Sequence, residues 1–277
     1  AEGGFFVPED FRTQVIHNTG VPGGVHRPYC TVLTTTLKDG YLPTMGSVSW
    51  AAIAEEAAYG DNTPTVGQVS FNIRKAGGTT KVSSELLEDS AVNLPALLSQ
   101  IFGEAQGRYE DTQLIGGDGS GEAEGIRTSG TDGTVSDSAT AVAIADFETW
   151  YFDLPAQFRA NATVSATSSL MAQVAALDVT ASKGSLTSSP ATTLLGRPTA
   201  LFDGTGWDDA TAISASEEVG CIGDFSNYYL IDRIGMSMRR DDSIYVANDQ
   251  VGFFARSRYD GRVGLADAFR IFKIAAS

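Results

Sequence analysis

The side chains best suited to acid–base or nucleophilic chemistry are few in this sequence. It holds two histidines, His17 and His26, and both lie near its beginning. A Ser-His-Asp or Cys-His arrangement would therefore have to be built on that segment. Neither G-x-S-x-G nor H-E-x-x-H occurs. We therefore predict no catalytic residues and expect that the protein is not an enzyme.

Carboxylates occur as neighbours in the sequence, at Glu55-Glu56, Glu217-Glu218 and Asp241-Asp242. Adjacent residues in strands or loops point apart, whereas acid–base catalysis needs two carboxyl groups that converge across a cleft. Solvated faces or ion pairs are the preferred interpretation. A hydrolase that uses scattered carboxylates remains the alternative from a different functional class.

No metal or cofactor site is indicated. Cys30 and Cys221 match no zinc spacing and form no disulfide framework. The glycine-rich loop 116–125 follows a predicted helix, lacks a GK[ST] ending and carries three acidic residues, so it is a poor phosphate cradle. Calcium binding by this loop stays open, although the spacing misses the EF-hand pattern. We expect no cofactor.

Composition describes a folded, loop-rich and acidic chain. Of its 277 residues 42% are hydrophobic and 19% charged, there are 30 glycines, and the formal net charge is −15. This charge disfavours tight binding to nucleic acid. The longest uncharged stretch, 160–177, is interrupted by polar residues, so we predict no membrane span.

The chain begins with glycines and prolines that favour an extended arm, in which Pro8 could open one short helix up to Ile16. From Thr44 to Lys75 apolar and polar residues alternate, which predicts the two strands of a long hairpin. Its tip, about 51–65, is polar. An isolated hairpin is marginal in water, so a neighbouring subunit is a candidate partner.

A long amphipathic helix is the clearest element. Ser83 to Ser90 predicts a short helix, and Asn93 is placed to cap a long one. Gly103 and Gly107 inside it each cost about 1 kcal/mol against alanine. They mark a close backbone approach, a bend, or simple tolerance by a well-packed helix. The glycine-rich loop 116–125 ends the helix.

The remaining elements are interspersed. Helices are predicted at about 143–153 and 167–177, and strands at 162–166, 219–222, 228–232, 244–247, 251–256 and 269–274. This order has no regular βαβ rhythm, so we predict an α+β fold.

Charge is unevenly distributed along the chain. Residues 233–277 carry eight basic and five acidic residues, a net +3, and the first 232 residues carry eleven and twenty-nine, a net −18. Arginines outnumber lysines fourteen to five, and arginine suits planar ion pairs at interfaces. Complementary subunit surfaces and charge compensation inside one subunit both explain the pattern.

Several segments, taken in order, resemble the major capsid protein of tailed bacteriophages, of the Hong Kong ninety-seven type. They are GGFFVPEDF at 3–11, the hairpin from Trp50 to Phe71, the stretch 83–121, LPAQFRANATV at 154–164, LLGRP at 194–198, GDFSNYYLIDR at 223–233 and NDQVGFFARSRYDGRV at 248–263. The resemblance spans nearly the whole chain.

The resemblance implies a capsid fold with four parts. Residues 1–32 would be the N-arm. Residues 33–130 would begin the peripheral domain, with an extended hairpin loop at 44–76 and a spine helix at 83–117. Residues 131–240 would form the axial domain, and 241–277 would return to the peripheral domain.

The implied function is self-assembly into the hexamers and pentamers of an icosahedral head that encloses double-stranded DNA. Implied partners are other copies of the chain, a portal, and possibly a scaffold, a head protease or cement proteins. The protein would be part of the virion and would assemble in the host cytoplasm. Many family members lose an N-terminal segment to a head protease, and a start at Ala1 without Met fits such a cut or ordinary removal of a methionine, between which the sequence does not decide. An encapsulin-type nanocompartment shell is the nearest alternative.

Some family members form covalent crosslinks between a hairpin lysine and an asparagine, assisted by a glutamate. Asn248 could match that asparagine, but no lysine lies between Ser47 and Arg74, and Ala255 stands where the glutamate would be expected. We predict no crosslinking. The predicted inter-subunit contacts involve aromatic and aliphatic residues, with arginines that pair carboxylates: Phe5, Phe6, Trp50, Ile53, Glu55, Glu56, Val66, Phe71, Arg239, Arg240, Arg256 and Arg258.

Overall fold

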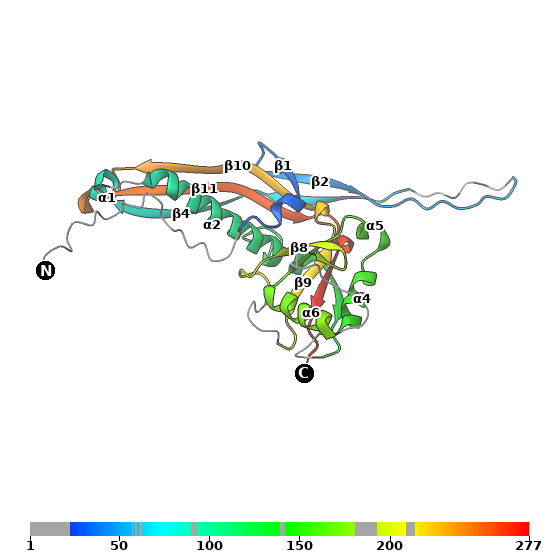
Figure 1. Ribbon diagram of the computed structural model, residues 1–277. Coiled ribbons are helices and arrows are strands. Elements are labelled where there is room, and N and C mark those ends of the chain that lie inside the picture. Colours follow the sequence, from blue (N-terminus) through cyan, green and yellow to red (C-terminus); the bar gives the residue numbers. More distant parts are fainter. Residues whose placement is uncertain are drawn as a thin grey trace.

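A 23-residue helix, α2 (Leu94–Gly116), runs along a long four-stranded sheet in the computed structural model (Figure 1). The structure describes residues 23–56, 58, 60, 63–89, 93–138, 142–180, 193–208 and 214–276. The predicted helix between Pro8 and Ile16 and the interface residues Phe5 and Phe6 lie outside these residues.

The helices of the described residues are α1 (Ser84–Asp89), α2, α3 (Ile126–Ser129), α4 (Ile144–Asp153), α5 (Ala156–Arg159) and α6 (Ser168–Thr180). None of them is long and apolar enough to cross a bilayer. The strands are β1 (Thr31–Thr34), β2 (Asp39–Met45), β3 (Val66–Asn72), β4 (Arg74–Ser83), β5 (Thr131–Val135), β6 (Thr163–Ala166), β7 (Thr193–Leu194), β8 (Arg197–Leu201), β9 (Glu218–Gly223), β10 (Tyr228–Asp241), β11 (Gln250–Val263) and β12 (Phe269–Lys273).

The strands form three sheets. The long sheet has the order β1-β10-β11-β4, and a second sheet has the order β5-β12-β9-β6-β8-β7. β2 and β3 pair only with each other and form a two-stranded ribbon. Figure 1 shows this ribbon continuing into a thin extension that leaves the rest of the molecule. We call residues 39–72 the hairpin arm.

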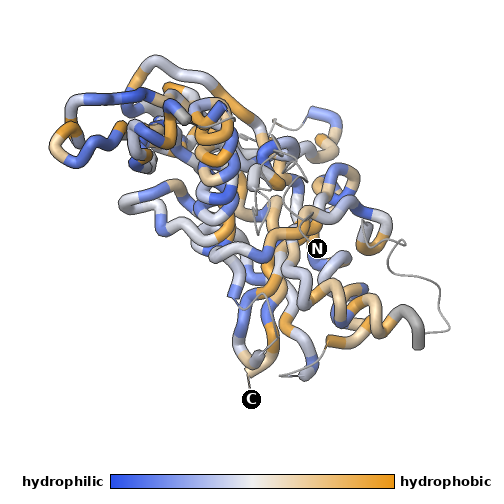
Figure 2. Tube along the Cα trace, turned by 60° about the vertical axis from the view of Figure 1, so that its left-hand side comes forward, coloured by the Kyte–Doolittle hydropathy of each residue, from blue (hydrophilic) through white to orange (hydrophobic). Residues whose placement is uncertain are grey.

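The six-stranded sheet is covered on both faces. On one face Phe147 and Trp150 of α4 pack against Phe272 of β12, with ring centroids 5.3 and 5.0 Å away. On the other face Ile271 and Cys221 join a cluster with Leu114 at the end of α2. In Figure 2 the strands that lead down to the C-terminus are mostly orange, in agreement with their burial.

That second cluster also joins the two large sheets. It holds Tyr228 and Tyr259 from the long sheet together with Phe269 from the six-stranded sheet. Because these residues are buried in one shared core, the end of the long sheet and the six-stranded sheet are packed as one body.

The predicted helices and most predicted strands are present. Asn93 caps α2 as predicted, because its Oδ1 accepts a hydrogen bond of 3.2 Å from the Ala96 N–H. The strand predicted at 244–247 is wrong. That segment holds a turn and the 3-10 helix η3 (Val246–Asn248), because it connects β10 to β11, and Asp249 adopts a left-handed conformation there with φ of 49°.

The position of the hairpin differs from the prediction. The strands that pair are β2 and β3, so Val48 and Trp50 belong to the extension and to no strand of the described residues. Their alternation predicted a strand, but a strand also needs a partner for its backbone groups. The last hydrogen bond at this end joins the Gly46 N–H to the Thr65 oxygen at 2.8 Å.

The two sheets also divide the chain differently from the predicted segments. β10 lies in the long sheet although 131–240 was assigned to the axial domain, and β12 lies in the six-stranded sheet although 241–277 was assigned to the peripheral domain. The reason is that β12 pairs with β9 and β5, whereas β10 pairs with β11.

Candidate assembly surface

A group of strongly exposed apolar side chains lies on the hairpin arm. Trp50 is 98% exposed, and Met45, Val66, Val48 and Ile53 are exposed as well. Burial of apolar surface contributes about 25 cal/mol per Å² to stability, and a side chain that stays exposed on a single subunit does not gain this free energy. A row of such residues on an extension therefore indicates a surface that another molecule covers.

Phe71 is placed differently from the other predicted contact residues. It is 8% exposed and packs with Ile73 and Ile231 inside its own subunit. A Cβ atom on Gly40 would lie 2.4 Å from its ring, so β2 needs a glycine there. The structure therefore makes Phe71 a core residue that anchors the base of the hairpin arm. Its predicted contact with a neighbour is corrected accordingly.

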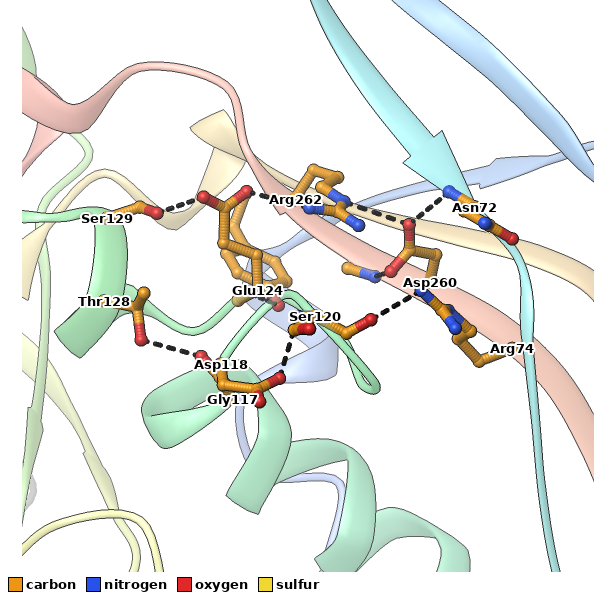
Figure 3. A network of polar contacts seen from close by, with 12 residues as sticks. Asn72, Arg74, Gly117, Asp118, Ser120, Glu124, Thr128, Ser129, Asp260 and Arg262 are labelled. Atoms are coloured by element: carbon orange, nitrogen blue, oxygen red, sulfur yellow. Dashed lines mark hydrogen bonds and ion pairs between the residues drawn. The ribbon is translucent and has the colours of Figure 1, made fainter.

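The base of the hairpin arm is held by buried charge (Figure 3). Asp260 of β11 is fully buried and accepts a hydrogen bond of 2.8 Å from the Asn72 N–H, where β3 ends. The Arg262 guanidinium lies 3.0 Å from the same carboxylate, and Arg74 donates a hydrogen bond of 2.6 Å to the Ser120 carbonyl. These bonds tie the base of the hairpin arm to β11 and to the loop 116–125.

The loop 116–125 takes part in this network. Asp118 accepts hydrogen bonds from the N–H groups of Ser120 and Gly121, and Glu124 contacts Ser129 and Arg262. Tyr228 donates a hydrogen bond of 2.7 Å to the Glu124 carbonyl. Among the described residues, no group of three or more His, Cys, Asp or Glu side chains is placed to hold a metal ion. The loop is thus an ordered connection between α2 and the long sheet.

Three of the four predicted interface arginines share one face of the long sheet. Arg256 lies opposite Ser237 and Gly77, Arg258 lies opposite Lys75, and Arg239 lies opposite Phe254. Directly opposite residues point to the same side of a sheet, and so do residues two apart in a strand. We call Lys75, Arg239, Arg256 and Arg258 the basic face.

Arg240 is separated from these arginines. It lies opposite the buried Phe253, on the side of the sheet that carries α2, and it lines a hollow with Glu88 of α1. Its Nε donates a hydrogen bond of 2.7 Å to Asp242. Glu55 and Glu56 are exposed, and they belong to the extension that leaves the rest of the molecule (Figure 1).

A series of buried hydrogen bonds joins the start of the described residues to α2 and to β6 of the six-stranded sheet. His26 is fully buried, with Nδ1 3.0 Å from an Asp111 oxygen and Nε2 2.7 Å from the Ser165 hydroxyl. Asp111 also accepts hydrogen bonds from the N–H groups of Val25 and His26, and Trp207 Nε1 donates to the Ser165 oxygen at 3.2 Å.

The donors and acceptors of this series are fixed in part by residue type. The Trp207 indole can only donate, so the Ser165 oxygen accepts from it. The Asp111 carboxylate accepts from the two backbone N–H groups and lies within hydrogen-bond distance of His26 Nδ1. The arrangement matches a catalytic Asp-His-Ser order, but all three side chains are buried, so no substrate reaches the hydroxyl. Sequence reasoning missed this group, because its members lie far apart in the chain.

Of the two cysteines, Cys221 is buried and Cys30 is half-buried. Burial raises the pKa of the Cys30 thiol and of the Cys221 thiol well above the usual value. Both therefore stay protonated and unreactive at neutral pH, as expected for free thiols in a core.

The comparisons with known proteins agree with this geometry. A family model described as the phage capsid family matches residues 3–274. Among solved structures, the capsid of a native GTA particle computed with C5 symmetry has a TM-score of 0.79 and 23% identity, covering 100% of this chain and 98% of that chain. No curated protein sequence matches the chain.

Two phage proteins are also similar. That of Gordonia phage Cozz has a TM-score of 0.72 and 15% identity, with 98% of this chain and 92% of that chain covered. That of Mycobacterium phage Adephagia has a TM-score of 0.70 and 14% identity, with 95% of each chain covered. At these identities the likeness establishes the fold, which is the predicted capsid fold of the Hong Kong ninety-seven type.

The family match decides between the functional classes that the sequence left open. The match does not favour the two alternatives, an encapsulin-type compartment and a hydrolase. It indicates a structural protein of the virion capsid. The chain therefore belongs to the phage capsid family and is a major capsid protein, a subunit of the shell of a phage head.

Proposed function

We propose that the subunit assembles into hexamers and pentamers of an icosahedral head that encloses double-stranded DNA, and that the hairpin arm of one subunit covers the basic face of the next. The observation that carries this proposal is the hairpin arm itself. It is an extension whose Trp50 is 98% exposed and whose two strands pair only with each other among the described strands.

Charge supports the same arrangement. Glu55 and Glu56 are exposed near the far end of the hairpin arm, and Arg256 and Arg258 are neighbours on the basic face. Arg239 is already paired with Asp241, but its side chain is 80% exposed, and such surface pairs contribute only about 0–1 kcal/mol. A neighbour's carboxylates can therefore replace or extend these pairs at little cost.

Charge reversal tests this pairing. Arg256→Glu with Arg258→Glu should leave the subunit folded but prevent particles, as seen by negative-stain microscopy. Adding Glu55→Arg and Glu56→Arg should restore particles. Arg240→Glu, on the other side of the sheet, is the matched control and should assemble. Normal particles from the Arg256/Arg258 variant would disprove the pairing, and failure of the Arg240 control would point to general misfolding.

The shell is proposed to hold without covalent crosslinks. No lysine lies on the hairpin arm, and Ala255, at the position of the expected glutamate, is buried in β11 without an ionisable group. Denatured particles should run as one band near 29 kDa. A ladder of higher bands would contradict this part of the proposal and leave the pairing of the hairpin arm untouched.

A head that encloses a genome contacts DNA and needs further protein partners. The net charge of −15 favours an inner surface that does not bind the duplex tightly, which leaves the DNA free to slide. A portal and possibly a scaffold, a head protease and cement proteins are the further partners, with assembly in the host cytoplasm and a role in assembly rather than catalysis. Particles purified from infected cells should contain DNA that is protected from nuclease.

A further inference from the structure

A groove lies between helix α2 and the strands β4, β11 and β10 of the long sheet. Its volume is about 480 Å³, and its walls include Phe102, Ala105 and Tyr109 of α2, Gly78 of β4, Ala255 of β11 and Met236 of β10. Polar residues line it as well: Lys75, Thr79, Gln106, Arg256 and Ser257. Gly78 keeps the space beside Phe102 open, since a Cβ atom there would lie 3.4 Å from the ring. A hollow of about 150 Å³ already holds a benzene ring, so this groove has room for an aromatic ring and further aliphatic groups. We call it the helix groove.

The beginning of the described chain wraps around the same helix. Arg27 pairs with Glu110, the backbone N–H groups of Val25 and His26 donate to Asp111, and Gly23 lies against the helix backbone. A Cβ atom on Gly23 would lie 2.4 Å from the Arg108 nitrogen and 2.6 Å from the Glu104 oxygen. Residues 23–27, which we call the arm root, therefore follow a fixed path.

The direction of that path points to the helix groove. At about 100° per residue, Glu110, Asp111, Glu104 and Arg108 follow one another around the helix in one sense of rotation. The next positions in that sense are Ala105, Tyr109 and Phe102, which are the helix wall of the groove. The path also moves from Asp111 toward the N-terminal half of α2, where Phe102 lies.

The segment before the arm root contains suitable side chains. Phe11, Val15 and Ile16 are apolar, and from Ile16 to Gly23 the chain can span at most about 23 Å. The helix wall from Phe102 to Tyr109 is only about 10 Å long. We propose that residues 11–16 of the same subunit occupy the helix groove and hold α2 against the long sheet.

This arrangement separates two parts of the N-terminal segment. Residues 11–16 act within their own subunit, whereas Phe5 and Phe6 remain beyond them and can reach a neighbour. The inference does not depend on the contacts between subunits, because the groove, the arm root and the segment belong to one chain.

Hydrogen–deuterium exchange on dilute, unassembled subunits tests the proposal. A truncation that starts at His17 should raise the exchange rate of the amides of 101–109 about tenfold, since local opening of α2 becomes easier. A truncation that starts at Phe11 should leave those rates unchanged. Amides of β12 report on global folding and should not change in either form.

Point variants complete the test. Val15→Asp with Ile16→Asp should reproduce the effect of the longer truncation, because a carboxylate against the apolar helix wall of Phe102, Ala105 and Tyr109 is costly. Thr13→Asp with Gln14→Asp is the matched control in the same segment and should show a smaller change. Unchanged exchange in the longer truncation would overturn the proposal. Protection of 101–109 that arises only in assembled particles would assign the groove to a neighbour's segment instead.

Discussion

The imidazole of His26 lies 3.0 Å from the carboxylate of Asp111, and 85 positions separate the two residues in the sequence. The same carboxylate accepts two backbone N–H groups from Val25 and His26, so one side chain of α2 holds the arm root in place. Through Ser165 the contact extends to β6 of the six-stranded sheet.

We expect Asp111→Asn to destabilise the subunit. The amide group of asparagine would replace one acceptor oxygen by a donor that faces N–H groups, and a buried polar group left unsatisfied costs about 1–3 kcal/mol. Denaturant unfolding of unassembled subunits measures the change. Asp242→Asn removes an ion pair whose carboxylate is 62% exposed, and this control should cost less than about 1 kcal/mol. Equal effects of the two variants would contradict the prediction.

Replacing Gly107 and Gly103 by alanine should change the stability of the subunit in opposite directions. A Cβ atom on Gly107 would lie 2.8 Å from the Gly24 nitrogen and 2.9 Å from the Gly23 carbonyl carbon, so the arm root would be displaced. At Gly103 the nearest atom is 4.0 Å away, on Met236.

Gly103→Ala should therefore stabilise the subunit by up to about 1 kcal/mol, which is the difference in helix propensity. Gly107→Ala should lower the midpoint of thermal unfolding despite the same propensity gain. If both variants were stabilised alike, the close approach of the arm root would be disproved.

The stability of the subunit should fall at alkaline pH. Burial raises the pKa of Tyr228 well above its ordinary value of 10.0, so the folded state keeps the phenol neutral. The unfolded chain releases this proton above pH 10, whereas the folded chain does not. The contribution of Tyr228 to the free energy of unfolding is therefore complete below pH 10 and decreases as the pH rises above it. Urea unfolding between pH 8 and 11 measures the decrease, and Tyr228→Phe should make it shallower.

The two buried tyrosines of the shared core provide a matched pair at neutral pH. Tyr228 donates to the Glu124 carbonyl, and the buried Tyr259 hydroxyl has no hydrogen-bond partner among the described residues. Tyr228→Phe should cost about 1–2 kcal/mol, and Tyr259→Phe should be neutral or stabilising. The opposite order would show that the Tyr228 bond contributes nothing.

Variants of Trp50 and Phe71 should distinguish effects on assembly from effects on folding. Trp50→Ser should leave the unfolding curve unchanged, because the side chain is 98% exposed, but it should reduce particle formation. Phe71→Ser should destabilise the subunit itself by about 3–5 kcal/mol, since the ring is buried with Ile73 and Ile231. Unfolding curves and particle yields, measured on the same preparations, distinguish the two effects. Normal assembly of the Trp50 variant would remove this residue from the proposed interface.

The sequence by itself determined the elements whose signals are local. The apolar stripe of α2 and its cap at Asn93 depend on residues three or four positions apart, so both could be predicted. β9 and β12 are short segments rich in apolar residues, and both could be predicted as strands. Motifs in order along the chain indicated the capsid fold, because each motif is a short local pattern.

Tertiary structure alone decided which segments pair. β4 contains the run Ala76-Gly77-Gly78-Thr79-Thr80, which lacks the pattern of a strand, and it forms because β11 supplies its backbone partners. Conversely, Val48 and Trp50 have the pattern but no paired strand in the subunit. The contact of His26 with Asp111 and Ser165 needs three distant segments to meet in one core, and no spacing within the sequence encodes that distance. The same is true of Phe71, since only the packing of β3 against β10 decides whether an apolar side chain faces its own core or a neighbour.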